Sequence, residues 1–286
     1  MPPLLAALRP RQWVKNVLVA AGPLAAGTLL QPTTLSRVGL AFVAFCASAS
    51  GVYLINDVLD REHDRAHPVK RLRPIASGAL RVPVAVAVGS LLLAGTPAVL
   101  AVLGFGALAG VLAFYGVMQL GYCLGLKHIA VVDLAVVAAG FLLRAVAGGA
   151  ATGVLLSTYF LLVASFGSLF MVAGKRYSEV HLLGEGEART RRSLEDYSAS
   201  YLRFVWSMAG AVTLAFYSLW AVGLQRRVEL LPQISIAFFS LSMLRYAVDI
   251  DRGAAGEPES IVFGDRVLQV LGVLWLASFL SSAVVG

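Results

Sequence analysis

Long apolar blocks divide the sequence, and they constrain the fold more than any other feature. Each block runs for roughly 17–22 residues with almost no charged side chains, which is the length that an α-helix needs to cross a bilayer. Hydrophobic residues make up 58% of the 286 residues and charged residues only 14%, whereas soluble domains carry about 25% charged residues. These features exclude a water-soluble globule, a disordered chain and a disulfide scaffold. The sequence therefore predicts an all-α, polytopic membrane protein.

The positions of the blocks predict nine transmembrane helices. The first is the weakest, because Pro23 interrupts it and it has few strongly apolar residues. Residues 1–13 precede it and are expected to form an interfacial segment, since they combine cations with Trp13. A cleaved signal peptide is the alternative for the first block. The expected spans are approximately Val14–Leu30, Val38–Ile55, Val82–Leu103, Phe105–Tyr122, Val132–Ala150, Thr158–Ala173, Phe204–Leu224, Leu231–Val248 and Val267–Val285.

Positive charge is distributed unevenly between the predicted loops. One side of the membrane receives all 23 Lys and Arg residues except Arg37, Arg226, Arg227 and the intramembrane Arg144. Because Lys and Arg concentrate in cytoplasmic loops, the N-terminus is expected in the cytoplasm and the C-terminus outside a plasma membrane. Only Glu229 among the acidic residues falls on the external side, so the active site is expected on the cytoplasmic side. The net charge of +7 favours a membrane surface or a phosphorylated substrate over a nucleic acid as partner.

An acidic run begins where the second expected span reaches the cytoplasm. It reads Asn-Asp-Val-Leu-Asp-Arg-Glu-His-Asp from Asn56 to Asp64. On a helix with about 100° per residue, Asp57, Asp60 and Asp64 fall within an arc of roughly 60° on one face. Such carboxylates repel one another unless they share a cation, and hard oxygen ligands suit Mg²⁺. The run predicts a magnesium site; a solvated helix end with arginine partners is the alternative.

Basic residues follow several predicted helix ends on the same side of the membrane. Pro68 is expected to end the acidic helix and to leave a cationic loop after it. For each cation the alternative is that it only fixes the topology or complements a helix dipole. The candidates for binding phosphate groups are Lys70, Arg73, Lys127, Lys175 and Arg176.

One arginine lies within the fifth expected span. An unpaired arginine there costs roughly 2.5–3.5 kcal/mol on insertion scales, so Arg144 is expected to face a partner or a watered cavity. Asp133 precedes it by close to three helical turns and lies on the same helix face. Both are expected to line a cavity open to the cytoplasm, with Tyr122 at the preceding loop. A salt bridge to another span is the alternative.

The acidic run resembles the first aspartate-rich motif of the UbiA superfamily of intramembrane prenyltransferases. The stretch from Lys127 through Asp133 to Arg144 also resembles that superfamily. The resemblance covers the whole chain and implies a single catalytic domain, residues 1–286, with nine helices around a central cavity open to the cytoplasm. Its catalytic loops would be residues 56–81 and 174–203. Typical members carry a second aspartate-rich motif after the sixth span.

The sequence departs from the family pattern at that second motif. Gly-Lys-Arg-Tyr-Ser-Glu occupies residues 174–179, and it is basic where carboxylates are expected. This variant, with Arg-Pro-Arg-Gln-Trp-Val-Lys-Asn at residues 9–16, is similar to the UbiA branch that uses 5-phosphoribosyl 1-diphosphate (PRPP) and decaprenyl phosphate, a polyprenyl phosphate. Members of that branch transfer 5-phosphoribose to the lipid for cell-wall arabinan synthesis. Cations in place of a second acidic cluster would bind the additional phosphates.

The resemblance implies a pentosyltransferase with Mg²⁺ as cofactor and assigns its site residues. Two alternatives are an aromatic prenyltransferase of the same superfamily and a cation-coupled secondary transporter, and self-association into a homo-oligomer is left open. The implied metal ligands are Asp57, Asp60 and Asp64, and the implied phosphate-neutralising residues are Lys175, Arg176 and Lys127. The remaining substrate-binding candidates are Lys15, Asn16, Asn56, Lys70, Arg73, Tyr122, Asp133, Arg144, Tyr177 and Glu179.

Overall fold

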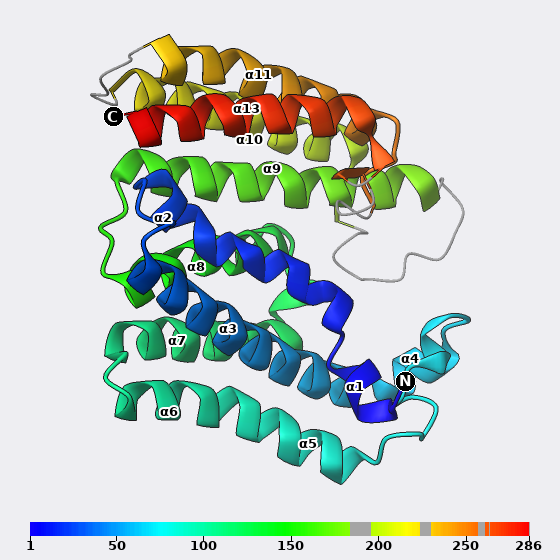
Figure 1. The fold of residues 1–286 in the computed structure, drawn as a ribbon. Coiled ribbons are helices and arrows are strands. Elements are labelled where there is room, and N and C mark those ends of the chain that lie inside the picture. The colour runs from blue at the N-terminus through cyan, green and yellow to red at the C-terminus, as the bar shows by residue number, and fades with distance from the viewer. Residues whose placement is uncertain (184–195, 224–229, 257–260, 263, 286) are drawn as a thin grey trace. The chain divides into compact units, whose positions relative to one another are not determined.

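A computed structural model describes residues 1–183, 196–223, 230–256, 261–262 and 264–285 (Figure 1). Throughout these ranges the secondary structure is helical and no strand occurs, so the all-α prediction is confirmed. The chain falls into two compact units, which are described separately. The first comprises Met1–Lys127 and Leu143–Leu155, and the second comprises His128–Leu142 and Leu156–Gly286.

The first unit is built around the long helix α3 (Pro32–Leu59), which packs against α5, α7 and the N-terminal 3₁₀ helix η1. Helices α3 and α5 approach closely because Gly51 and Gly89 have no side chains; a Cβ on Gly51 would lie 2.9 Å from the Gly89 carbonyl oxygen. The other elements of this unit are α1 (Pro3–Ala7), η1 (Pro10–Ala20), α2 (Ala21–Ala25), α4 (Arg61–Ala66), η2 (Lys70–Leu72), α5 (Val82–Ser90), the π-helical η3 (Leu91–Gly95), α6 (Thr96–Val102), α7 (Gly106–Leu124), η4 (Leu126–His128) and the second half of α8 (Val132–Thr152).

The second unit packs α9 (Thr158–Leu183) against α10 (Ala199–Gly223), and α11 (Leu230–Asp251) against α10 and α13 (Arg266–Val285). Its core includes Phe170, Ala173 and Ile250. Helix α9 continues to Leu183, so residues 174–183 are helical where we expected a loop. The reason is burial, because apolar side chains of these turns remain in the core. Residues 184–195 of the expected loop lie outside the described residues.

Seven described helices are long and apolar enough to cross a membrane, and α13 carries a shorter apolar stretch. The first expected span is wrong as a continuous helix, since η1 ends at Ala20 and α2 ends at Ala25. The count of nine spans stays a prediction, as does its orientation; Arg226, Arg227 and Glu229 lie outside the described residues. The seven helices are Pro32–Leu59, Val82–Val102, Gly106–Leu124, Val132–Thr152, Thr158–His181, Ala199–Gly223 and Leu230–Asp251.

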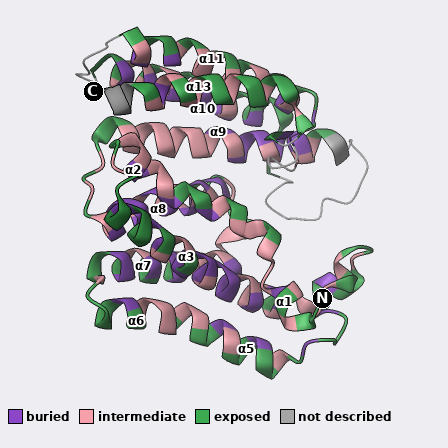
Figure 2. Cartoon of the chain, in the orientation of Figure 1, coloured by how far each residue is buried: buried purple, intermediate pink, exposed green. Residues whose placement is uncertain are grey.

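Large apolar side chains are exposed on the outer faces of these helices. Val43 on α3, Val117 on α7 and Leu219 on α10 are each more than half exposed. Figure 2 shows buried positions in purple along α3, with exposed positions in green on helices such as α6 and α13. Contiguous exposed apolar surface of this extent is unfavourable in water and is expected where lipid covers the helices.

Candidate active site

The acidic run lies at the C-terminal end of α3, and it is not one continuous helix. Helix α3 ends at Leu59, Asp60 caps it with φ −88° and ψ 5°, and α4 begins at Arg61. The expectation of a single continuous helix carrying all three aspartates is therefore wrong. The break at Asp60 instead allows the aspartates to meet cations from different parts of the first unit.

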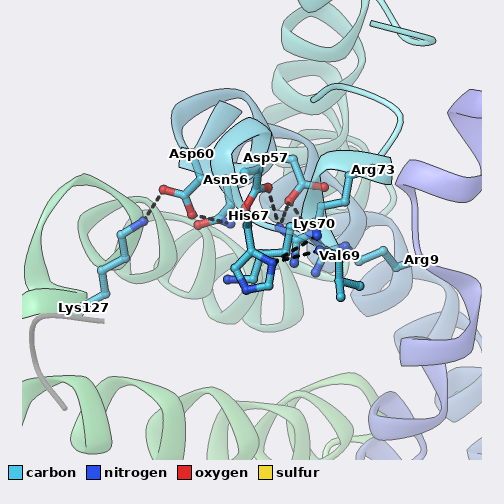
Figure 3. Close-up of polar contacts among 10 residues, drawn as sticks. Arg9, Asn56, Asp57, Asp60, His67, Val69, Lys70, Arg73 and Lys127 are labelled. Carbon is cyan, nitrogen blue, oxygen red and sulfur yellow. Dashed lines mark hydrogen bonds and ion pairs between the residues drawn. The ribbon is translucent and has the colours of Figure 1, made fainter. Parts of the chain in front are cut away.

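Asp57 and Asp64 converge on the same arginine. Nη1 of Arg73 lies 3.1 Å from Oδ1 of Asp57 and 2.6 Å from Oδ2 of Asp64, and both aspartate side chains are only 2% exposed. A second guanidinium reaches Asp57, because Nη2 of Arg9 lies 2.6 Å from Oδ1 (Figure 3). Two buried carboxylates thus point their oxygens at a single cationic nitrogen.

Asp60 has its own cation. Its Oδ1 lies 2.5 Å from Nζ of Lys127, and its Oδ2 accepts a hydrogen bond of 3.2 Å from the Asn56 side chain (Figure 3). The structure therefore brings together two site candidates, Asn56 and Lys127, that are 71 residues apart in the sequence. The sequence placed Lys127 among the phosphate-binding candidates but did not predict its partner.

The cationic loop follows α4 as expected, since α4 ends at Ala66, two residues before Pro68. Lys70 begins the short helix η2, and Arg73 is its C-cap. Arg73 is the member of this loop that reaches the acidic cluster, and its side chain is 29% exposed. The loop thus delivers one predicted phosphate-binding cation directly to the aspartates.

Arg9 is a site residue that the sequence reasoning missed, because it assigned Arg9 only to an interfacial segment. Its backbone is in the left-handed region with φ 54°, and its guanidinium lies over the Tyr53 ring, 5.0 Å from the centroid. The segment after it is tied to α3 through Ser50, which accepts a hydrogen bond from Trp13 Nε1 and donates one to the Leu8 carbonyl. Arg9 and Asp57 are separated by 48 residues, so no local sequence pattern could have paired them.

Arg144 and Asn16 are buried together inside the first unit. Arg144 is 6% exposed, its Nε donates to Asn16 Oδ1 at 2.8 Å, and its guanidinium lies over the rings of Phe45 and Tyr115. Asn16 is 1% exposed and also donates to the Cys46 sulfur at 3.2 Å. The Asn16 amide therefore joins η1 to α3 and α8, and its role in substrate binding stays a prediction.

Two further candidates of the first unit lie nearer its surface. The Lys15 ammonium donates to the Gln12 side chain at 2.9 Å within η1. Tyr122 is half-buried near the end of α7. Both remain candidates for substrate binding.

The second unit contains a separate, buried cluster around Asp133, which is 0% exposed at the start of α8. Its Oδ1 accepts a hydrogen bond of 2.5 Å from the Tyr197 hydroxyl, and its Oδ2 accepts one of 3.3 Å from Arg176 Nε. Arg176 also binds Glu179 at 2.7 Å. Burial raises the pKa of Tyr197 above its usual value, and the hydrogen bond to the Asp133 carboxylate raises it further. Asp133 and Arg144 therefore have different partners, and the cavity that both are expected to line stays a prediction.

The basic motif at the end of α9 divides into buried and accessible residues. The Lys175 ammonium lies 4.0 Å from Glu179, and the Lys175 side chain is 40% exposed. Tyr177 is 2% exposed, stacks on His181 and accepts a hydrogen bond of 2.7 Å from Arg203. Tyr177 is thus a core residue, and its contact with substrate stays a prediction. Arg203, which the sequence reasoning did not select, holds the Tyr177 hydroxyl instead.

The donor chemistry of the first unit fits a divalent cation. Among the described residues, no three His, Cys, Asp or Glu side chains are already arranged as a metal site, because the aspartates are turned toward cations. The oxygens of Asp57 and Asp64 nevertheless converge on one positive nitrogen, and carboxylate oxygens are the ligands that Mg²⁺ prefers. Asp57, Asp60 and Asp64 are therefore the residues that could hold such an ion.

Comparison with known proteins decides the family. A profile of the UbiA prenyltransferase family matches residues 17–283. The chain belongs to this family. It is similar to the decaprenyl-phosphate phosphoribosyltransferase of Mycobacterium tuberculosis, with 50% identity over 284 residues that cover 95% of this chain and 91% of the relative. The enzyme of the same name from Corynebacterium glutamicum is 49% identical over 280 residues, 96% of this chain and 84% of the relative. The prediction of a UbiA-family transferase is confirmed.

Solved structures of UbiA homologues share the fold. A homologue from Archaeoglobus fulgidus bound to DMAPP and Mg²⁺ has a TM-score of 0.74 and 17% identity, and the match covers 99% of each chain. A homologue from Aeropyrum pernix has a TM-score of 0.59 and 15% identity, covering 96% of this chain and 98% of that one. The predicted UbiA-like fold is confirmed, and the chain is an integral membrane protein of the UbiA family.

Proposed function

We propose that this UbiA-family protein transfers 5-phosphoribose from PRPP to a polyprenyl phosphate, with decaprenyl phosphate as the acceptor that its relatives' names suggest. The observation that carries the proposal is the combination of about 50% identity over 95% of the chain with a buried carboxylate cluster that is surrounded by cations. A site of this kind suits a substrate that arrives as a metal-complexed diphosphate. The product would serve cell-wall arabinan synthesis.

Asp57, Asp60 and Asp64 would hold Mg²⁺ in this proposal. When bound, the ion would neutralise negative charge on the leaving diphosphate. Arg9, Arg73 and Lys127 already lie within 3.1 Å of these carboxylates, and guanidinium and ammonium groups form charge-assisted hydrogen bonds with phosphate oxygens. We assign these three cations to the diphosphate of PRPP, together with the side-chain amide of Asn56.

The chemical step needs little from a general base. A phosphate oxygen of the lipid acceptor is anionic at neutral pH, and it forms the new bond to ribose C1. The bond from C1 to the diphosphate oxygen breaks, and the diphosphate leaves with the electron pair, so the configuration at C1 inverts. The residues of the chain therefore act by orienting the substrates and by stabilising charge on the leaving group.

Lys175 is an accessible cation of the basic motif at the end of α9, with its side chain 40% exposed, and we assign it to a phosphate group of one of the substrates. Arg176 is only 3% exposed and its charge is compensated by Asp133 and Glu179. We therefore assign Arg176 to the scaffold and no longer to the phosphate. We also propose that the substrate side of the protein faces the cytoplasm across a plasma membrane, where the soluble sugar diphosphate is delivered.

The test is incorporation of radiolabelled phosphoribose into lipid by the purified protein in proteoliposomes. We expect transfer from PRPP to decaprenyl phosphate that depends on Mg²⁺ and stops when a chelator is added. Incubation with geranyl diphosphate and an aromatic acceptor is the competing arm, because a structural relative is described in complex with GPP and Mg²⁺. Prenylation of the aromatic compound without phosphoribosyl transfer would overturn the proposal.

A further inference from the structure

The short segment between α4 and η2 has an unusual acceptor for its backbone N–H groups. The first N–H groups of any helix lack a partner within that helix, and Pro68 itself has no N–H. Here the N–H groups of Val69 and Lys70 both point to Nδ1 of His67, at 3.2 and 3.3 Å. The imidazole faces these two residues in Figure 3. The His67 side chain thus supplies the hydrogen-bond acceptor for the two N–H groups at the start of η2.

The backbone of His67 is tied to both neighbouring elements. Its N–H donates to the Asp64 carbonyl, and its own carbonyl accepts the N–H of Arg71, both at 3.2 Å. The residue ends α4 in an extended conformation with φ −85° and ψ 133°. The turn from α4 into η2 is therefore fixed by His67 through its backbone and its ring.

The loop that starts at His67 ends at Arg73. The Arg73 N–H donates to the Lys70 carbonyl at 2.9 Å, and its guanidinium bridges Asp57 and Asp64. Because η2 is a single short turn, a shift of its first residues would carry Arg73 with it. The position of a cation at the acidic cluster thus depends on a ring whose Nδ1 accepts hydrogen bonds from the backbone of Val69 and Lys70.

We propose that His67 is a positioning residue: its Nδ1 caps η2 and so sets the place of Arg73 for the diphosphate of PRPP. The proposal rests on the proposed function for its substrate, and on the backbone geometry for the cap itself. The ring must be the neutral tautomer with its proton on Nε2, since Nδ1 accepts both hydrogen bonds. Asn in place of His67 keeps an acceptor at the Nδ1 position, whereas Gln places its amide near the Nε2 position.

Hydrogen exchange of the Val69 and Lys70 amides tests the cap without any substrate. In the His67→Ala protein we expect exchange about tenfold faster than in the parent, because both N–H groups lose their acceptor. His67→Asn should return the rates to within about threefold of the parent. Equal exchange in the parent and the His67→Ala protein would overturn the proposal. If the alanine variant fails to fold, the parent is compared with the His67→Asn and His67→Gln proteins. Faster exchange in the Gln protein alone supports the cap, and equal exchange in all three proteins would overturn it.

Kinetics test what the cap does for the reaction. We expect His67→Ala to raise the KM for PRPP about tenfold and to change kcat less than twofold, since binding rather than chemistry is disturbed. His67→Asn should restore the KM and His67→Gln should not. Restoration by Gln alone would show that the ring acts through Nε2 on a ligand, which contradicts the proposal. His67→Ala should add nothing to the effect of Arg73→Ala, because both act through one cation.

His63 supplies the matched control, since it is an exposed histidine on α4 four residues before His67. His63→Asn should leave both the exchange rates and the KM at parental values. The two readouts also separate the two proposals. If no variant uses PRPP but the exchange pattern holds, the proposed function fails and the cap stands; if PRPP is used but the exchange does not respond to His67, the cap fails.

Discussion

The two units contain the same kinds of charged residue in different environments. In the first, the cations that meet the aspartates are partly exposed, Arg9 by 26% and Arg73 by 29%. In the second, Asp133 and Arg176 are 0% and 4% exposed in their side chains. A buried ion pair is costly to break, whereas a partly exposed cation can exchange its partner at modest cost. From this comparison we propose that the first cluster binds ligands and that the second holds the fold together.

A strained backbone residue adjoins the cluster of the second unit, as Arg9 does in the first. Val131 has φ 67°, a conformation that is rare for a β-branched residue. Its N–H donates to the Tyr197 hydroxyl at 2.6 Å, so the hydroxyl joins Val131 to Asp133 at the start of α8. Strained residues persist only where their surroundings hold them in place. Tyr197 and Asp133 provide that restraint in the second unit.

The largest expected effect is the loss of activity in Asp57→Asn. We expect the rate of phosphoribosyl transfer to fall about a thousandfold, because a charged ligand of the proposed metal and a partner of two arginines is removed. Radiolabel transfer in proteoliposomes measures it. Asp251→Asn, in an ion pair with Arg203 that is more than half exposed, is the matched control and should retain parental activity. Parental activity in Asp57→Asn would contradict the ligand-binding role that we propose for the cluster of the first unit.

Asp133→Asn should act on stability instead. Removing one charge of a buried pair leaves Arg176 partly uncompensated, so we expect a loss of about 3 kcal/mol in the free energy of unfolding. Thermal unfolding of the purified protein in detergent measures the change. The transfer rate per folded molecule should stay within about threefold of the parent, which is under 1 kcal/mol. A large loss of rate in a stable, folded variant would show that Asp133 belongs to the active site.

Glycine contacts offer a second comparison between the units. A Cβ on Gly148 would overlap the backbone carbonyl of Val19, which cannot move aside, whereas a Cβ on Gly174 would meet the flexible end of the Ile250 side chain. We expect Gly148→Ala to cost about 3 kcal/mol of stability and Gly174→Ala about 1 kcal/mol. Gly110→Ala is the control, since nothing lies within 4 Å of its Cβ position. Equal losses at Gly148 and Gly110 in thermal unfolding would contradict the packing.

Tyr197→Phe should have a smaller effect than Asp133→Asn or Gly148→Ala. It removes one hydrogen bond to Asp133 and the acceptor for the Val131 N–H, so we expect a loss of about 1–2 kcal/mol. Val131→Gly should recover part of that loss, because glycine adopts positive φ without strain. Because the pKa of Tyr197 is raised in the folded protein, its hydroxyl ionises at a lower pH in the unfolded chain. The parent should therefore lose stability as the pH rises above about 10, and Tyr197→Phe should lose less. A pH series of unfolding curves that is identical for the two proteins would contradict this reading of Tyr197.

Much of the fold follows from local sequence patterns. Apolar length predicts the span at Val132–Ala150, and the structure extends it only to Thr152. Pro68 correctly predicts the end of α4. The first span fails because η1 is a 3₁₀ helix packed against α3 that includes the polar residues Arg11, Gln12, Lys15 and Asn16, and its short α-helical continuation ends at Ala25.

The candidate site shows what local patterns cannot give. The sequence identified the aspartates and Lys127, but the ion pair from Arg9 to Asp57 spans 48 residues and the hydrogen bond from Tyr197 to Asp133 spans 64. Such pairs depend on how the helices pack, which periodicity does not encode. The end of α3 at Leu59 was also not predicted. Asp57 and Asp64 contact Arg73, whereas Asp60 contacts Lys127.

A density map of the protein with bound PRPP and Mn²⁺ tests most directly whether the three aspartates hold the metal ion of the diphosphate. Mn²⁺ replaces Mg²⁺ in this experiment because it is easier to locate. We expect an ion within about 2.5 Å of oxygens from Asp57 and at least one of the other two aspartates, with the diphosphate against Arg9, Arg73 or Lys127. An ion and diphosphate bound elsewhere, with Arg73 still joining Asp57 to Asp64, would contradict it.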